Sequence, residues 1–172
     1  MKIYDIDKNY IAELQKNDPI ILNPTGAHYK HERKYLGIIF QINGCDYFIP
    51  LSSPDKVDDY INGKIRKSSK VVIRMTRIDK NNKESLLGTI RLNAMFPVYN
   101  KSVIINYDLN AETDLAYKDL IINELEFINE NRDNILKKAK DLYRLKTRQM
   151  KIPMLNYVCD FLKLEEVAKK YK

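Results

Sequence analysis

Two adjacent hydroxyl side chains, Ser52 and Ser53, stand between two prolines in the segment IPLSSPDK, residues 49–56. Pro50 and Pro54 bracket them, and Lys56 follows closely. Such a stretch is consistent with a plain turn at the end of a strand. It is also consistent with two hydroxyl groups held open beside a cation, where neutral hydroxyls suit the positioning of a phosphate better than covalent attack. Spacing alone does not decide between these interpretations.

Lysine and arginine concentrate in two tracts, 64–80 and 137–151, and Asp79 is the only acidic residue of the first. In the first tract, Lys70 and Arg74 are expected on one face of a strand. In the second, cations recur three or four residues apart, which stacks like charges along one side of a helix. A polyanion alongside would reverse that repulsion, whereas the alternative is a solvated helix face. The predicted RNA-binding residues of the two tracts are Lys64, Arg66, Lys67, Lys70, Arg74, Arg77, Lys137, Lys140, Arg144, Arg148 and Lys151.

Other kinds of catalytic site have little support. His28 and His31, with Glu32 beside them, would be half of a metal site, but no second cluster completes it, and two exposed loop histidines are the favoured interpretation. The serines are not part of a Gly-x-Ser-x-Gly elbow, and the five glycines form no phosphate-binding loop. We therefore expect neither a metal nor a cofactor.

The elements that must position these residues change character along the chain. Asn43-Gly44 predicts a hairpin turn between strands at 35–42 and 45–51. Further strands are expected at 3–4, 71–78, 86–92 and 103–107, with 95–98 ending the strand at 86–92 because Pro97 cannot donate to a ladder. Asp7 is expected to cap a short helix. Helical periods follow over 112–131, 132–149 and 156–171, so we predict an α+β fold with a small barrel-like antiparallel sheet.

Length and composition limit the class of protein. The chain has 172 residues, which predicts one domain over 1–172. Lys and Arg number 30 against 23 Asp and Glu, a net charge of +7 that favours polyanionic partners. Cys45 and Cys159 lie far apart, and neither a leader nor a membrane-spanning run is evident, so we expect a cytoplasmic protein with no membrane partner.

Four segments, taken in order, resemble the ToxN/AbiQ family, the protein toxins of type III toxin–antitoxin and phage-abortive systems. They are Tyr4…Lys8-Asn9-Tyr10-Ile11…Leu14, then RKYLGIIF from Arg33, IPLSSP from Ile49, and GTIRLNAMFPV from Gly88. The matches keep the family's order and spacing over residues 1–130, and the last forty residues agree in character. Within the family the set is nearest to the CptN branch.

The resemblance implies a compact, strongly bent antiparallel sheet, related to the Kid/MazF ribonuclease toxins and wrapped by helices. It implies a sequence-specific endoribonuclease that needs no metal and leaves 2′,3′-cyclic phosphate and 5′-hydroxyl ends. It further implies inhibition by a small structured antitoxin RNA, cut by the toxin from tandem repeats, with which the protein closes into a ring-like assembly. Cellular or phage RNA would be the substrate.

The resemblance also implies which positions of this sequence correspond to the family's site residues. The family's hydroxyl pair falls on Ser52 and Ser53, and its N-terminal tyrosine falls on Tyr10. The basic residue that precedes the family's aromatic-Ile-Gly strand falls on Arg33, with Lys34 beside it as a substitute and an RNA contact. The family's lysine after the second proline is Asp55 here, and the lysine comes one residue later, at Lys56, where Asp55 would orient it.

These residues support a mechanism in which the 2′-hydroxyl of the RNA is the nucleophile, so that the protein aligns the attack, moves protons and stabilises charge. We hypothesise that Arg33 and Lys56 stabilise the phosphorane. Ser53 and Ser52 would position the phosphate or relay a proton, and Tyr10 would orient the substrate or stack on it.

Two alternatives to an enzyme stay open. One is a non-catalytic RNA- or DNA-binding regulator that uses the same basic surface and keeps the serines as a structural turn. The other is an interaction module whose helical C-terminal half docks a protein partner. The ends of the products from RNA incubated with pure protein would distinguish an enzyme from a binder.

Overall fold

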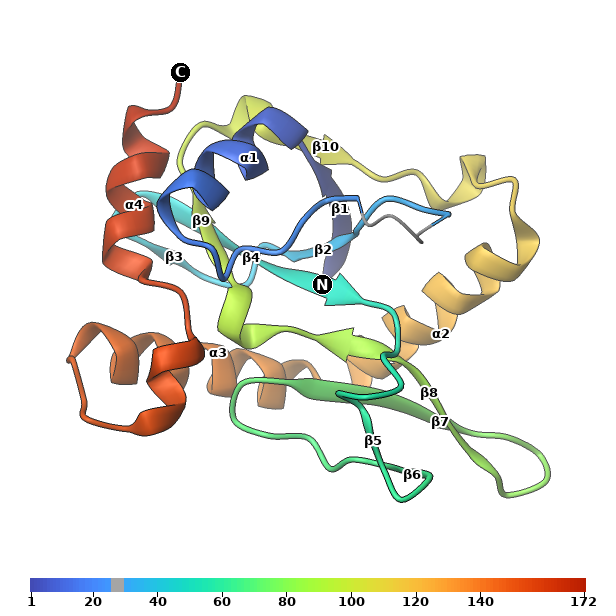
Figure 1. Ribbon diagram of the computed structural model, residues 1–172. Helices are drawn as coiled ribbons and strands as arrows, with labels where there is room; N and C mark the ends of the chain where they lie inside the picture. The colour runs from blue at the N-terminus through green and yellow to red at the C-terminus, as the bar shows by residue number, and fades with distance from the viewer. Residues whose placement is uncertain (26–29) are drawn as a thin grey trace.

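Strands dominate the chain up to residue 106 and helices dominate it afterwards, as the change in sequence period predicts. The computed structural model describes residues 1–25 and 30–172 (Figure 1). The main sheet runs in the order β10-β1-β2-β4-β8-β7, with β3 and β9 also paired to β4, and each pairing is antiparallel. Its strands are β1 (Lys2–Ile6), β2 (Tyr35–Gly37), β3 (Gln41–Ile42), β4 (Cys45–Ser52), β7 (Ile73–Ile78), β8 (Glu84–Ile90), β9 (Phe96–Val98) and β10 (Ile104–Asn106).

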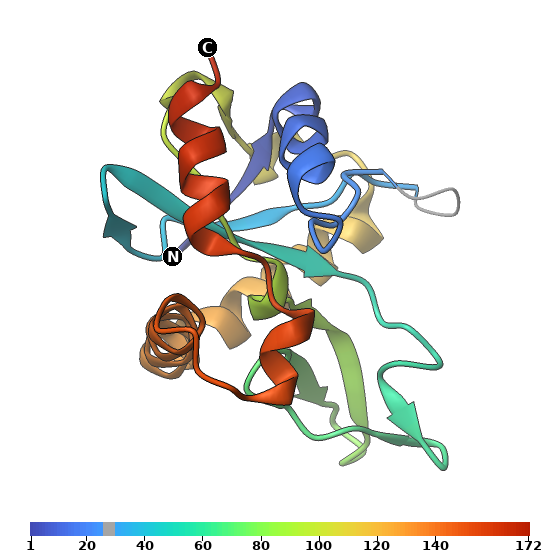
Figure 2. The ribbon, with the colours of Figure 1, turned by 60° about the vertical axis from the view of Figure 1, so that its left-hand side comes forward.

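Helices cover the sheet on different sides. The α-helices of the described residues are α1 (Lys8–Asn17), α2 (Leu115–Glu130), α3 (Arg132–Thr147) and α4 (Phe161–Lys170). Short 3₁₀ turns are η1 (Leu92–Ala94), η2 (Lys101–Val103), η3 (Leu109–Ala111) and η4 (Pro153–Tyr157). Helix α4 packs against β9 and α1, and Figure 2 shows α4 in front of the sheet. Helix α2 packs against β7 and β8. Within the described part of the chain, no helix is both long and apolar enough to cross a bilayer.

The predicted α+β fold is confirmed, but the barrel-like sheet is not. Among the described strands, β10 pairs only with β1 and β7 pairs only with β8, so the two ends of the sheet do not meet. The sheet is therefore open, and helices rather than further strands cover its faces.

Asparagine–glycine turns set the strand connections. Asn43 and Gly44 have φ values of 52° and 79°, the positive values that a tight hairpin needs, and the predicted hairpin forms with Ile42 opposite Cys45. Its first arm is divided into β2 and β3. Asn62 and Gly63, with φ of 50° and 73°, close a second hairpin between β5 (Tyr60–Ile61) and β6 (Lys64–Ile65), which was not predicted from the sequence.

Residues 96–98 do not end a strand, contrary to the prediction, but form β9, with Pro97 opposite Tyr47 of β4. The carbonyl of Pro97 accepts a hydrogen bond from the hydroxyl of Tyr10 in α1, so this residue's backbone polar groups face away from β4. The N–H that proline lacks is consequently not needed in the ladder.

The C-terminal helices are tied to the sheet through a buried carboxylate. Glu165 of α4 accepts hydrogen bonds from the hydroxyls of Tyr47 and Tyr143, each at 2.8 Å, and from the amide of Asn43 at 2.8 Å. The side chain is only 2% exposed. These bonds satisfy a charge that would otherwise be costly to bury, and they join β4, α3 and α4 at one point.

Asp7 caps α1 as predicted, since its carboxylate accepts hydrogen bonds from the backbone N–H groups of Asn9 and Tyr10 at 2.8 and 3.0 Å. We expect Asp7→Ala to lower the free energy of unfolding by about 1 kcal/mol, measured by urea denaturation. Asp7→Asn keeps a capping oxygen and serves as the control, with a loss of only a few tenths. Equal losses in the two variants would contradict the capping role.

Candidate active site

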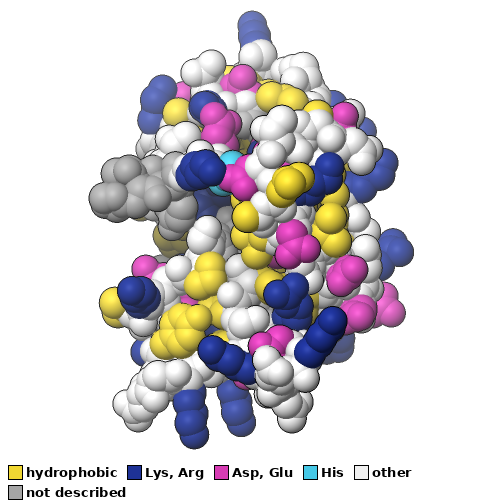
Figure 3. All heavy atoms as spheres, turned by 90° about the vertical axis from the view of Figure 1, so that its right-hand side faces the viewer, with side chains coloured by type: hydrophobic (Ala, Val, Ile, Leu, Met, Phe, Trp, Pro, Cys, Tyr) yellow, Lys and Arg dark blue, Asp and Glu magenta, His cyan; other side chains and the backbone are white. Residues whose placement is uncertain are grey.

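A pocket of about 410 Å³ lies between the end of β4, the segment 30–34 and helix α2. Figure 3 shows the face that carries α2, where a histidine lies between basic and acidic side chains beside a hollow. We call this hollow the serine pocket. It is lined by Pro24, Lys30, His31, Glu32, Arg33, Lys34, Leu51, Ser52, Ser53, Tyr117, Leu120, Ile121 and Glu124.

The guanidinium of Arg33 holds the end of β4. One nitrogen, Nη1, donates to the carbonyl of Leu51 at 2.6 Å and to the hydroxyl of Ser52, while Nε donates to the carbonyl of Asn23 at 2.8 Å. The structure thus brings Ser52, Ser53 and Arg33 into one pocket, with the hydroxyl of Ser52 beside a cation.

Lys34 also lines the pocket, but its ammonium turns inward. The Nζ atom lies 2.8 Å from Asp5 Oδ1 and 4.2 Å from the centre of the Tyr107 ring, and the side chain is 10% exposed. An ion pair and a cation–π contact of this kind already stabilise the charge. The predicted contact between Lys34 and RNA would have to disrupt both.

His31 is held inside the pocket rather than exposed on a loop. Its ring stacks on Tyr117, with centroids 3.8 Å apart and planes 2° from parallel, and Nε2 lies 3.2 Å from Asp114 Oδ2. Asp114 also caps α2, and the hydrogen bond from Lys30 holds the pKa of its carboxyl well below the usual range. His28 lies outside the described residues. Within 1–25 and 30–172, no three His, Cys, Asp or Glu side chains group as a metal site.

Glu124 lines the pocket too, although it was not predicted from the sequence. It is 5% exposed and shares the buried stripe of α2 with Ile121 and Ile128. Its carboxyl group makes no hydrogen bond to any described residue, and burial raises its pKa to about 8. A carboxylate within an apolar helical stripe is the sequence signal that would have identified it.

Two predicted catalytic residues are not brought to the serine pocket. The placement of Tyr10 corrects its assignment to substrate contact, because its ring is fully buried against Tyr171 and its hydroxyl bonds to Pro97. Lys56 lines a separate depression of about 540 Å³. Asp55 does not orient it; the Asp55 carboxylate accepts from the backbone N–H groups of residues 57 and 58, and these bonds lower its pKa.

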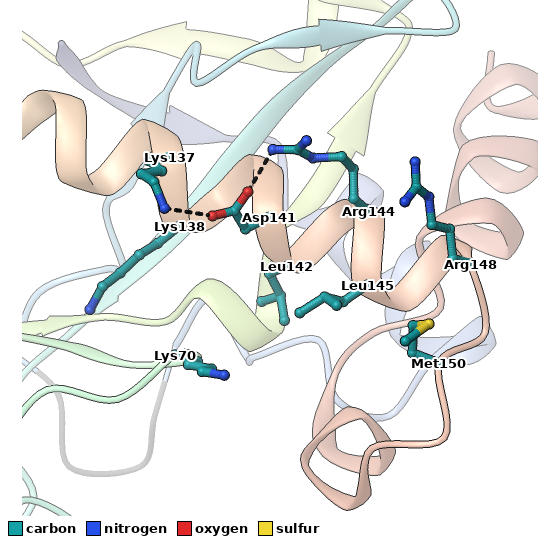
Figure 4. A pocket seen from close by; sticks show the side chains of 9 residues that line it. All are labelled: Lys70, Lys137, Lys138, Asp141, Leu142, Arg144, Leu145, Arg148 and Met150. Carbon is teal, nitrogen blue, oxygen red and sulfur yellow. Dashed lines mark hydrogen bonds and ion pairs between the residues drawn. The ribbon is translucent and has the colours of Figure 1, made fainter.

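The two basic tracts meet in a second pocket, of about 570 Å³, which we call the basic groove (Figure 4). Asp141 lies between two cations there, accepting from Lys137 at 3.1 Å and from Arg144 at 2.6 Å. The predicted stack of like charges on α3 is thus partly neutralised. The groove is lined by Lys70, Lys137, Lys138, Asp141, Leu142, Arg144, Leu145, Arg148 and Met150.

Arg74 does not face the groove, which corrects the expectation that it shares a face with Lys70. Its guanidinium pairs with buried Asp59 at 3.0 Å, and the two side chains are 10% and 1% exposed. A buried carboxylate requires such a partner, so this arginine serves the fold. Lys70 precedes β7, which begins at Ile73, and is therefore free of the strand's alternation.

The other predicted RNA-binding residues are exposed but lie outside the basic groove. Arg77 donates to the side chain of Asn123 in α2 at 2.8 Å, and Arg66 donates to the carbonyl of Tyr60 at 3.0 Å. The exposed residues outside the groove are Lys64, Arg66, Lys67, Arg77, Lys140 and Lys151.

Comparison with known proteins covers nearly the whole chain. Residues 2–169 match the family described as toxin ToxN of the type III toxin–antitoxin system. The endoribonuclease ToxN of Bacillus thuringiensis subsp. kurstaki is 30% identical over 99% of this chain and 84% of its own length. A solved structure from work on a processed non-coding RNA that regulates a bacterial antiviral system superposes with a TM-score of 0.82, at 27% identity over 99% of both chains. Another, from work on selective toxin inhibition by a non-coding RNA pseudoknot, gives 0.80 at 29% identity over 99% of this chain and 96% of that one.

The raised pKa of Glu124 makes stability depend on pH. Between the value of an unfolded glutamate, about 4.3, and about 8, the folded protein holds a proton that the unfolded chain releases, so stability falls as pH rises. Glu124→Gln removes this pH dependence. We therefore expect the variant to gain on the wild type by up to about 1.4 kcal/mol per pH unit in this window, measured by urea unfolding at pH 5.5 and 7.5. Parallel pH curves for the two proteins would contradict this expectation.

Proposed function

We propose that this chain, which belongs to the ToxN family of type III toxin–antitoxin toxins, is an endoribonuclease with its active site in the serine pocket. The observation that carries the proposal is the meeting of Ser52, Ser53 and Arg33 in one pocket at the end of β4, where the Ser52 hydroxyl accepts a hydrogen bond from the fixed Arg33 guanidinium. The name of the Bacillus relative, an endoribonuclease, supports the reaction class.

The proposed reaction uses the substrate's own nucleophile. The 2′-hydroxyl of the RNA attacks the adjacent phosphorus, the bond from phosphorus to the 5′-oxygen breaks, and 2′,3′-cyclic phosphate and 5′-hydroxyl ends result. Arg33 offsets the charge of the phosphorane, while Ser52 and Ser53 donate hydrogen bonds to its oxygens. The placement of Lys56 in a neighbouring depression favours contact with the RNA strand beyond the reacting phosphate.

A small structured antitoxin RNA is the proposed partner, together with cellular or phage RNA as substrate. The work on the two similar structures concerns non-coding RNAs, one processed and one a pseudoknot that inhibits its toxin. In this chain the basic groove offers a surface for such an RNA, because it combines cations from two tracts with the apolar side chains of Leu142, Leu145 and Met150. We propose that toxin and RNA close into a ring-like assembly and that the toxin cuts the RNA from a repeat precursor.

The proposed chemistry is tested by incubating the purified protein with a bacteriophage genomic RNA in excess EDTA and identifying the new ends. We expect cleavage to persist and to leave cyclic phosphates and 5′-hydroxyls, because no metal takes part in the steps assigned above. Loss of activity in EDTA, or 5′-phosphate products, would refute this mechanism. Intact RNA without EDTA would favour a non-catalytic RNA-binding protein.

Removal of the Ser53 hydroxyl should slow cleavage by roughly a hundredfold, the usual cost of losing one donor to a developing oxyanion. Ser53→Ala is compared with Ser102→Ala, which removes an exposed hydroxyl in η2, in single-turnover assays on the same RNA. Thermal unfolding checks that both variants are folded. Wild-type rates in a folded Ser53→Ala protein would show that this serine is only part of a turn.

Removal of positive charge from the basic groove should weaken RNA binding and its dependence on salt. We expect the double variant Lys70→Gln, Arg148→Gln to bind less tightly, with the slope of log K against log salt reduced by roughly 0.7 to 0.9 for each phosphate that is no longer neutralised. Lys170→Gln with Lys172→Gln, at the exposed end of the chain, removes the same charge elsewhere. If the two double variants lost RNA affinity equally, the groove would contribute no more than any other positive charge on the surface.

A further inference from the structure

The buried carboxyl group of Glu124 has no role in the reaction as assigned so far. It lies on the stripe of α2 that faces the sheet, and it lines the same pocket as Ser52 and Ser53. A Cβ atom placed on Gly88 of β8 would lie 2.5 Å from Glu124 Oε1 and 2.9 Å from the carbonyl oxygen of Ser52. The carboxyl therefore sits close to the end of β4, in space that is open because residue 88 has no side chain.

This side chain lacks the partners that explain the other buried carboxylates. Glu165 accepts three hydrogen bonds, and Asp59 is paired with Arg74. Within the part of the chain that the structure describes, Glu124 has neither a hydrogen bond nor an ion pair, although only 5% of its surface is exposed. Burying a polar group without a partner costs free energy, and such a cost is commonly retained where function requires the group.

We propose that Glu124 is the general acid of the ribonuclease reaction, donating its carboxyl proton to the 5′-oxygen as that oxygen leaves phosphorus. The inference rests on the proposed function of the serine pocket and deepens it. As the 2′-oxygen bonds to phosphorus, its proton passes to solvent water. The bond from phosphorus to the 5′-oxygen breaks, the carboxyl proton completes the 5′-hydroxyl, and the carboxylate regains a proton from water.

The surroundings of the carboxyl keep it in the acid form required for this step. Desolvation raises its pKa to about 8, so it holds a proton at neutral pH. The charged and titratable side chains of the pocket are Tyr117, which lies on the same helix, and those of the segment from Lys30 to Lys34, with His31 among them. A general acid works best with a pKa near the working pH, which this environment provides.

A substrate whose leaving group needs no proton distinguishes a general acid from a residue that only supports the fold. The cleavage site is first mapped with wild-type protein on a bacteriophage genomic RNA. Two oligonucleotides then carry that site, one natural and one with sulfur in place of the bridging 5′-oxygen. A thiol has a pKa of about 8.5, so the thiolate leaves without protonation. Glu124→Gln preserves the shape and neutral charge of the protonated carboxyl, and Glu126→Gln changes an exposed residue of the same helix.

We expect Glu124→Gln to cleave the natural oligonucleotide at least about a hundredfold more slowly than the wild type, the usual contribution of a general acid. On the sulfur oligonucleotide the two proteins should differ by less than about tenfold, and Glu126→Gln should match the wild type on both. Equal losses on both oligonucleotides would assign Glu124 to structure, and no loss on the natural one would remove it from the reaction; either result overturns the proposal. Wild-type protein that cleaves no RNA would instead defeat the ribonuclease function itself.

Discussion

The pairing of β4 within the sheet is the constraint on which the site depends. Neighbouring strands bond to both edges of β4. Strands β2 and β3 precede it in the chain, with β3 connected to it by the Asn43-Gly44 turn, and β8 and β9 return to it later in the chain. A one-residue slip in this ladder would turn every β4 side chain to the opposite face. Arg33 fixes the last residues of the strand to the loop before β2, so the hydroxyl of Ser52 is held by backbone geometry as well as by its own hydrogen bond.

Two helices line two different pockets, α2 the serine pocket and α3 the basic groove. Helix α2 lines the serine pocket with apolar side chains and with the carboxyl group of Glu124, whose pKa is raised because burial removes it from water. Helix α3 presents its cations to solvent in the basic groove, where they suit long-range attraction to a polyanion but contribute little to stability. In the function proposed above, the pocket at α2 carries the chemistry and the groove at α3 binds the RNA strand.

Features set by neighbouring residues could be predicted from the sequence. The Asp7 cap, the Asn43-Gly44 hairpin and the three C-terminal helices depend on local backbone chemistry, and each is confirmed. Features set by distant contacts could not. The burial of Tyr10 depends on its contacts with Pro97 and Tyr171, which are distant in the sequence. The inward orientation of Arg74 depends on its ion pair with Asp59. Glu124 reaches the pocket only because α2, far along the chain, returns to β7 and β8. The Ser52-Ser53 pair could be selected from sequence only through resemblance, since its spacing alone fits a simple turn.

All of the proposed chemistry requires that the scissile phosphate bind in the serine pocket. A crystal structure of the protein with an oligonucleotide that carries the cleavage site and lacks the attacking 2′-hydroxyl would locate that phosphate. We predict that it lies within hydrogen-bonding distance of Ser53 and of the Arg33 guanidinium, with the flanking strand directed toward the basic groove. A scissile phosphate bound in the basic groove, with the serine pocket free of RNA, would contradict the proposed site.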